Sequence, residues 1–212
     1  MTEVRKQTVG KQSIQFEHAV HILSGASIVG KKEGEGPLGK YFDVVGKEDG
    51  MFGCQSWEEA ESVLQKEAVS MAIGKAELEK WQIRTIYVGD LLAQTIASSF
   101  GILGFDTPVY GLYGACATMG EALSLSSMAV AAGYGDYVVA VTSSHFGSAE
   151  KEFRFPLGYG NQRPLSATWT VTGSGACVLG TNGGKARITG ITTGKIIDFG
   201  LKDSLNMGAC MA

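Results

Sequence analysis

The chain has 212 residues, with 18 basic and 21 acidic side chains and a formal net charge of −3. That length is enough for one ordinary domain with a sizeable core. The small negative charge gives no basic face for phosphate groups, so we expect no nucleic-acid partner. Thirty residues are glycine, roughly twice the usual share of about 7%, and they follow no period. The glycines therefore indicate tight turns and close backbone packing rather than a collagen-like or disordered chain.

Cysteine usage and the N-terminal residues indicate the compartment. The four cysteines, Cys54, Cys116, Cys177 and Cys210, show no CxxC pair and no secreted-scaffold spacing, so we expect neither disulfides nor a metal site. The first 20 residues lack the apolar stretch of a signal peptide. No apolar run approaches the roughly 18 residues that a membrane span needs. We expect a soluble, cytoplasmic protein that is not secreted, with peripheral attachment to a membrane left open.

The first half of the sequence alternates strands and helices. We expect a strand at 19–30, a glycine-rich loop at 30–53, a helix at 57–74, a strand at 83–90 and a helix at 91–104. Ser56 and Glu59 form a capping box in front of an apolar stripe that repeats at helical spacing until Gly74. Asp90 ends a short apolar strand and is placed to cap the helix that follows.

The second half begins with a strand that leads through a sharp turn into a helix. We then expect a helix at 117–132, a strand at 137–144, a long loop at 147–169 and two strands at 172–180 and 186–198. An Asn182-Gly183 turn lies between these last two strands. The helix 117–132 is almost entirely small or apolar, so we expect it to be buried on all sides. The continuous apolar run 137–144 is typical of a strand covered on both faces. Together these elements predict an α/β sandwich.

Cys116 is the sharpest chemical feature. The segment around it, GACAT, places a thiol where a helix begins, and backbone N–H groups and the helix dipole there favour a thiolate. The same N–H groups could bind an anionic ligand. A small buried cysteine that merely fits a crowded turn is the structural alternative, because free cysteines are among the most buried residues.

A reactive cysteine needs a base within hydrogen-bond reach. His145 directly follows the strand 137–144, at the carboxyl end where α/β proteins place ligands, and it fits a pocket role or a structural role equally well. Ser143 and Ser144 beside it could donate to the same ligand. The following loop offers cations for an anionic ligand at Lys151, Arg154 and Arg163.

Other patterns are weaker. His18 and His21 lie in the first strand and are expected to be structural. The GSGA at 173–176 resembles a phosphate loop, but no helix follows it, so no nucleotide or other cofactor is expected. Cys177 is expected in the core.

Four segments taken together resemble the thiolase and ketoacyl-synthase superfamily: GDLLAQTIASSFGILG, GLYGACATMGEALSLSSMAVAAG, GDYVVAVTSS and TGSGACVLG. The resemblance runs over roughly residues 15–200 in one continuous order. It implies a thiolase-like layered α/β sandwich. It also implies that Cys116 occupies the position of the acyl-accepting nucleophile.

Within that superfamily the sequence is most similar to the stage V sporulation protein AD family of spore-forming bacteria. The phrases VGDLLAQ, YGACATMGE, TTGKIID and the long segment 142–176 carry this similarity. It implies a protein of spore formation that binds dipicolinic acid (pyridine-2,6-dicarboxylate) and assists its uptake into the developing spore. It further implies homo-oligomers and work with other proteins of the same operon at the inner spore membrane.

The superfamily fold is an internal duplication. The resemblance therefore assigns 1–185 to the N-terminal half and 186–212 to the beginning of the second half, and we expect the chain to be a fragment. In the family the catalytic histidine and a second histidine or asparagine belong to the second half.

Three functions compete. The first is a non-catalytic binding protein that holds an anionic aromatic ligand through Cys116, Ser143, Ser144, His145 and Arg163. The second is an acyltransferase or ketoacyl-synthase-type enzyme with Cys116 as nucleophile, which would need a base and an oxyanion stabiliser that we do not find in the sequence. The third is a structural subunit. We favour the first, because fold alone does not establish enzyme activity.

Overall fold

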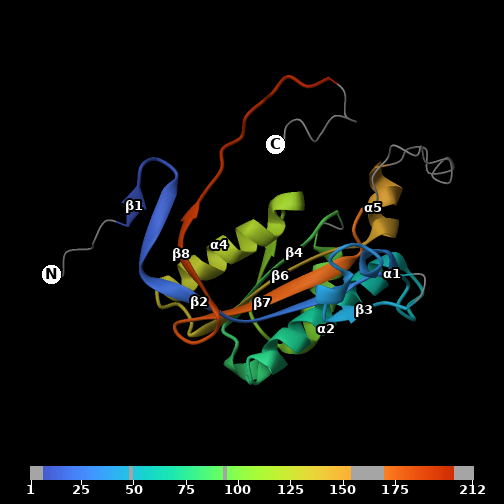
Figure 1. Ribbon diagram of the computed structural model, residues 1–212, viewed down its shortest axis with the longest axis horizontal. Helices are drawn as coiled ribbons and strands as arrows, with labels where there is room; N and C mark the ends of the chain where they lie inside the picture. The colour runs from blue at the N-terminus through green and yellow to red at the C-terminus, as the bar shows by residue number, and fades with distance from the viewer. Residues whose placement is uncertain (1–6, 48–49, 93–94, 154–169, 203–212) are drawn as a thin grey trace.

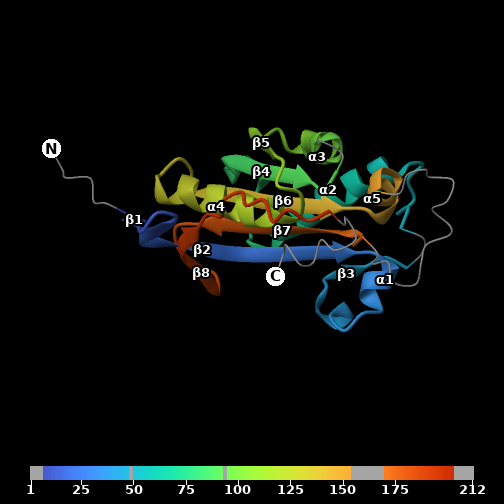
Figure 2. The ribbon, with the colours of Figure 1, turned by 90° about the horizontal axis from the view of Figure 1, so that it is seen from above.

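One mixed β-sheet organises the computed structural model, which describes residues 7–47, 50–92, 95–153 and 170–202. The strand order along the sheet is β1-β2-β7-β6-β4-β5, and β3 and β8 also pair with β2 (Figure 2). The strands are β1 (Thr8–Val9), β2 (Ser13–Val29), β3 (Val44–Val45), β4 (Thr85–Asp90), β5 (Val109–Leu112), β6 (Tyr137–Ser144), β7 (Gly173–Gly180) and β8 (Ala186–Thr192). Strands β4, β5 and β6 are parallel, whereas β7 runs antiparallel to both of its neighbours.

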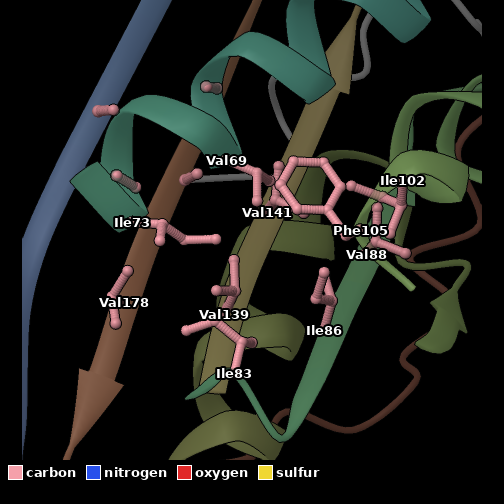
Figure 3. Packing of buried hydrophobic residues seen from close by; sticks show 14 of the residues in the cluster. Val69, Ile73, Ile83, Ile86, Val88, Ile102, Phe105, Val139, Val141 and Val178 are labelled. Carbon is pink, nitrogen blue, oxygen red and sulfur yellow. The ribbon is translucent and has the colours of Figure 1, made fainter. Parts of the chain in front are cut away.

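Helices cover the sheet on both faces, with α2 (Trp57–Lys75) on one side and α4 (Thr118–Ala131) on the other (Figure 1). The apolar run of β6 is continuous because its alternate residues enter two separate cores. Val139 and Val141 pack in the cluster under α2, where Figure 3 shows them with Val69. Val138 and Ala140 pack in the cluster under α4. The predicted strand 137–144 and its burial on both faces are confirmed.

The capping box before α2 is confirmed at its main contact. The Ser56 side chain accepts a hydrogen bond of 3.1 Å from the backbone N–H of Glu59. The Glu59 carboxylate accepts from the N–H of Gln55 at 3.0 Å instead of from Ser56. The first contact satisfies an amide group that the first turn would leave unpaired, and the second pairs the amide of the residue before the cap.

Asp90 caps α3 as predicted, but that helix is shorter than the expected 91–104. Helix α3 spans Ile96–Ile102, because Thr95 adopts a left-handed backbone with φ of 70° that ends any earlier helical turn. The Asp90 carboxylate accepts hydrogen bonds from the backbone N–H groups of Thr95 and Ser98 at 3.3 and 3.1 Å.

The expectation that the helix 117–132 is buried on all sides is wrong. A 3₁₀ turn occupies Ala115–Ala117, and α4 then runs over Thr118–Ala131. Ala122 and Val130 are buried against the sheet, whereas Glu121 is exposed and Leu125 is partly exposed. The helix touches the sheet along one side only, so its outer side has no covering layer among the described residues.

Several boundaries also differ from the sequence prediction. The first strand begins at Ser13 rather than at residue 19, because its early part pairs with β1 and β8. The loop expected at 30–53 contains two short helical segments and β3, and the loop expected from 147 begins as a helix. The remaining helical segments are α1 (Lys31–Gly34), Gly39–Tyr41, Lys80–Gln82, Leu103–Phe105 and α5 (Phe146–Phe153).

The last two strands do not pair with each other. Strands β7 and β8 both pair with β2, and His21 and Ile22 have partners in each of them. Strand β8 therefore belongs to the same sheet as the rest of the chain. The division into segments 1–185 and 186–212 stays a prediction.

Gly89 should be intolerant of any side chain. An added Cβ would lie 2.4 Å from Thr118 Cγ2 and 2.8 Å from the Leu112 carbonyl oxygen. We expect Gly89→Ala to lower the free energy of unfolding in urea by about 1–3 kcal/mol. As a matched control, Gly120→Ala on α4 meets no atom within 4 Å and should raise that free energy by up to about 1 kcal/mol. Equal stabilities of the two variants would contradict this packing.

Candidate functional site

Cys116 lies in the turn between β5 and α4, and it is exposed. The alternative of a buried, purely structural cysteine is therefore wrong. The residue before it, Ala115, has φ of 46°, in the left-handed region that favours glycine. Such strain costs about 1–3 kcal/mol and is concentrated at functional sites. The turn that presents the thiol is thus held in an unfavourable conformation by its surroundings.

Thr118 helps to stabilise this conformation of the turn. Its hydroxyl donates a hydrogen bond of 2.7 Å to the carbonyl of Ala115, and the N–H of Ala117 donates to the carbonyl of Gly114 at 2.8 Å. Thr118 is fully buried, and its methyl group contacts the space that a side chain on Gly89 would fill. The end of β4 therefore fixes where α4 and the thiol begin.

The start of α4 has no side-chain cap, and an acidic side chain lies in its first turn. Ala117, the residue that precedes the helix, provides no side-chain cap, so backbone N–H groups of the first turn have no local side-chain acceptor. Exposed Glu121 lies in the same turn, and its Oε2 would be 2.7 Å from a Cβ on Gly114. The carboxylate of Glu121 therefore lies against the turn that carries Cys116.

Strand order separates Cys116 from His145. The carboxyl ends of β5 and β6 lie at the same edge of the sheet, but β4 runs between them. Two strand spacings amount to about 10 Å. A ligand would therefore have to bridge the end of β4 to touch both residues.

His145 is buried, at 1% exposed, and both of its ring nitrogens have partners inside the protein. Its Nε2 lies 2.7 Å from the carbonyl oxygen of Gly50, and its Nδ1 accepts from the N–H of Gly147 at 3.1 Å. Because a carbonyl only accepts, Nε2 carries the proton and the ring is neutral. Burial lowers the pKa of His145 below its ordinary value. This geometry matches the structural alternative for His145 and leaves no free ring nitrogen to act as a base.

The two serines beside it also have internal partners. Ser143 is buried, and its hydroxyl donates to Glu61 at 2.7 Å. The Ser144 hydroxyl donates to the carbonyl of Val171 at 2.5 Å. Arg163 and Arg154 lie outside the described residues, and the structure describes Lys151 only as part of α5.

Cys177 and His21 occupy structural positions. Burial raises the pKa of the Cys177 thiol, which is partly buried within β7 as expected. The His21 ring contacts the carbonyl of Gly183 at 2.5 Å, and His18 is exposed on β2. Cys210 lies outside the described residues. Over the described part of the chain, no three histidine, cysteine or acidic side chains group in a way that could hold a metal ion.

Sequence reasoning missed a buried polar cluster next to Ser143. Gln65 on α2 donates from its amide nitrogen to Ser143 at 2.7 Å and to the carbonyl of Gly89 at 3.0 Å. Glu61, one turn earlier, accepts from Ser143. Both are almost fully buried. A signal was present, because the two residues adjoin the apolar stripe of α2 at Ala60 and Leu64.

Comparison with known proteins decides the family. The sequence model of the family "Stage V sporulation protein AD (SpoVAD)" matches residues 10–212. The chain belongs to the stage V sporulation protein AD family. The curated Stage V sporulation protein AD of Bacillus subtilis (strain 168) is 40% identical over 205 residues, which make up 96% of this chain and 60% of that protein. The chain thus spans less than two thirds of the length of this relative.

Solved structures show that this family member has a thiolase-like fold. One is 3-oxoacyl-[acyl-carrier-protein] synthase III from Aquifex aeolicus VF5, with a TM-score of 0.54 and 14% identity over 77% of this chain and 54% of that one. Another is cerulenin-bound OleA from Xanthomonas, with a TM-score of 0.54 and 14% identity over 79% and 58% of the two chains. At these identities the likeness concerns the fold alone.

The predicted fold class and the sporulation family are therefore confirmed. Within the described part of the chain, no helix is long and apolar enough to cross a membrane.

Proposed function

We propose that this family member is a non-catalytic, thiolase-like protein of spore formation that binds dipicolinic acid and assists its uptake into the developing spore. The observation that supports this most is the exposed Cys116 turn at the uncapped start of α4. Backbone N–H groups at a helix start favour a carboxylate. The exposed ring of Tyr113 in the same turn offers an apolar surface for an aromatic ligand.

The binding role fits the histidine geometry better than an acyltransferase role does. His145 has both nitrogens engaged and is separated from Cys116 by β4. An acyl-transfer enzyme with Cys116 as nucleophile is the alternative, and it would need a base from another part of the protein. Ser143, Ser144 and His145 then support the neighbouring backbone, whereas Cys116 and the first turn of α4 contact the ligand.

A second copy of the chain is the partner that we propose for the β5 edge of the sheet. Strand β5 ends the strand order, so one side of its backbone pairs with no strand among the residues that the structure describes. Exposed apolar residues lie on α3, on the 3₁₀ turn that follows it and on the strand itself, at Ile96, Phe100, Leu103, Val109 and Tyr110. A groove of about 410 Å³ between α2 and α3 is also lined by Phe100. Two such edges related by a two-fold axis would pair antiparallel and cover each other's apolar residues. Other proteins of the operon and a peripheral contact with the inner spore membrane remain predictions of the family.

Calorimetric titration of dipicolinic acid into the protein of full natural length tests the ligand site. We expect Cys116→Trp to abolish binding by filling the turn, whereas Cys116→Ala should weaken it only slightly. Glu121→Gln should tighten binding about two- to fivefold, because it removes a negative charge beside the dianion. Unchanged affinity in Cys116→Trp and Glu121→Gln would place the ligand elsewhere. A covalent acyl group on Cys116 after incubation with acyl-CoA would favour the enzyme.

Sedimentation velocity tests the self-association surface. We expect the parent chain to sediment as a dimer and Phe100→Glu to sediment as a monomer, because a buried unpaired charge opposes association. Tyr134→Glu is the matched control, since Tyr134 is 77% exposed and lies beyond the end of α4, away from β5. A dimer that persists in Phe100→Glu, or a parent that is monomeric, would refute this surface.

A further inference from the structure

Gln65 and Thr118 approach Gly89 from opposite faces of the sheet. Helix α2 carries Gln65 and covers one face, whereas α4 begins with Thr118 and covers the other (Figure 1). The Gln65 amide nitrogen donates to the carbonyl oxygen of Gly89 at 3.0 Å. On the other face, a Cβ on Gly89 would lie 2.4 Å from Thr118 Cγ2, so the threonine methyl group packs against bare backbone. Gly89 is therefore the point where the two helix layers meet through the sheet.

The hydrogen bonds around Gln65 fix the orientation of its amide. The same nitrogen lies 2.7 Å from Ser143 Oγ and 3.2 Å from Ser98 Oγ. The hydroxyl of Ser143 donates its proton to Glu61. The hydroxyl of Ser98 donates its proton to Asp90. Since both hydroxyl oxygens and the backbone carbonyl can then only accept, the group that faces all three must be the NH₂ of the amide.

This orientation leaves one atom of Gln65 unpaired. The residue is 0% exposed, and its Oε1 has no hydrogen-bond partner among the residues that the structure describes. A buried acceptor without a donor is unfavourable, and an apolar side chain of similar length would avoid it. We therefore attribute the glutamine at this position to the contacts of its nitrogen.

The carbonyl that Gln65 binds lies where β4 loses one of its neighbours. Strand β5 pairs with β4 only as far as Gly89, opposite Leu112, whereas β6 continues beside Asp90. Among the described residues, the end of β4 thus has a strand on one side only. The position of this end matters for the site, because Thr118 packs on it and holds the turn at Ala115.

We propose that Gln65 is a positioning residue for the Cys116 turn and acts from the opposite face of the sheet. Gln65 holds the carbonyl of Gly89, and Gly89 in turn seats Thr118. Thr118 then holds the strained backbone that presents the thiol. The value of this positioning for ligand binding rests on the proposed function, whereas the positioning itself involves no ligand.

Hydrogen–deuterium exchange of the protein of full natural length tests the positioning. Gln65→Met keeps the length of the side chain and removes the donor, so we expect the amides of residues 115–118 to exchange about fivefold faster. Ser24→Ala is the matched control, because it removes the 2.6 Å hydrogen bond from Ser24 to the carbonyl of Ala72 in the last turn of α2. That variant should leave exchange in the turn unchanged.

A double-mutant cycle with Thr118→Ala separates positioning from a general loss of stability. Alanine lacks both the methyl group that packs on Gly89 and the hydroxyl that bonds to Ala115. In this background Gln65→Met should accelerate exchange in the turn no further, because the two changes act along one path. An undiminished effect of Gln65→Met in the Thr118→Ala background, or an equal effect of Ser24→Ala, would refute the proposal.

A reciprocal measurement needs no change at Gln65. Thr118→Ala should shift the NMR signal of the Gln65 side-chain amide, since both residues contact Gly89. An unmoved signal would contradict the proposal even if Gln65→Met failed to fold. None of these readouts involves dipicolinic acid, so a ligand that binds elsewhere would overturn the ligand site and leave this test intact.

Discussion

Close contact between the end of β4 and the start of α4 is the constraint on which the site depends. Gly89 has no side chain, so Thr118 can pack against the strand and bond to the carbonyl of Ala115. That bond holds Ala115 in a left-handed conformation, and the thiol of Cys116 is exposed as a result. The position of the thiol is thus fixed by backbone packing two elements away, and any ligand at this turn binds a surface that is already formed.

The same edge of the sheet holds two polar sites of different character. At the end of β5, Cys116 is exposed and the first turn of α4 has no side-chain cap, as ligand binding requires. At the end of β6 the groups are buried and bonded to one another through Glu61, Ser143 and Ser148. The intervening strand β4 contributes to both, because Gly89 supports the first and Asp90 lies beside the second.

Local patterns predicted the elements well where one face or both faces of an element are buried. The alternation of Val138 to Val141 between two cores follows from their apolar run, and the caps at Ser56 and Asp90 follow from single side chains. The start of α3 was not predictable in this way, because the left-handed Thr95 depends on tertiary contacts. Neither was the one-sided burial of α4, since its composition alone does not say what covers it.

The candidate site was predicted in part. Cys116 was found because its motif marks the start of a helix. His145 was grouped with it because both follow strands, but strand order depends on long-range pairing that spacing along the chain does not reveal. Glu61 and Gln65 adjoin the apolar stripe of α2, but their burial depends on α3, β6 and α5, which spacing along the chain does not bring together.

The most direct test of the ligand site is an NMR titration of isotope-labelled protein with dipicolinic acid, in which backbone amide shifts are followed residue by residue. We predict that the largest shifts fall on Cys116 and the first turn of α4, with smaller changes at Tyr113. Shifts confined to the groove between α2 and α3, or no shifts at dipicolinic acid concentrations that saturate other binding measurements, would contradict the proposed site.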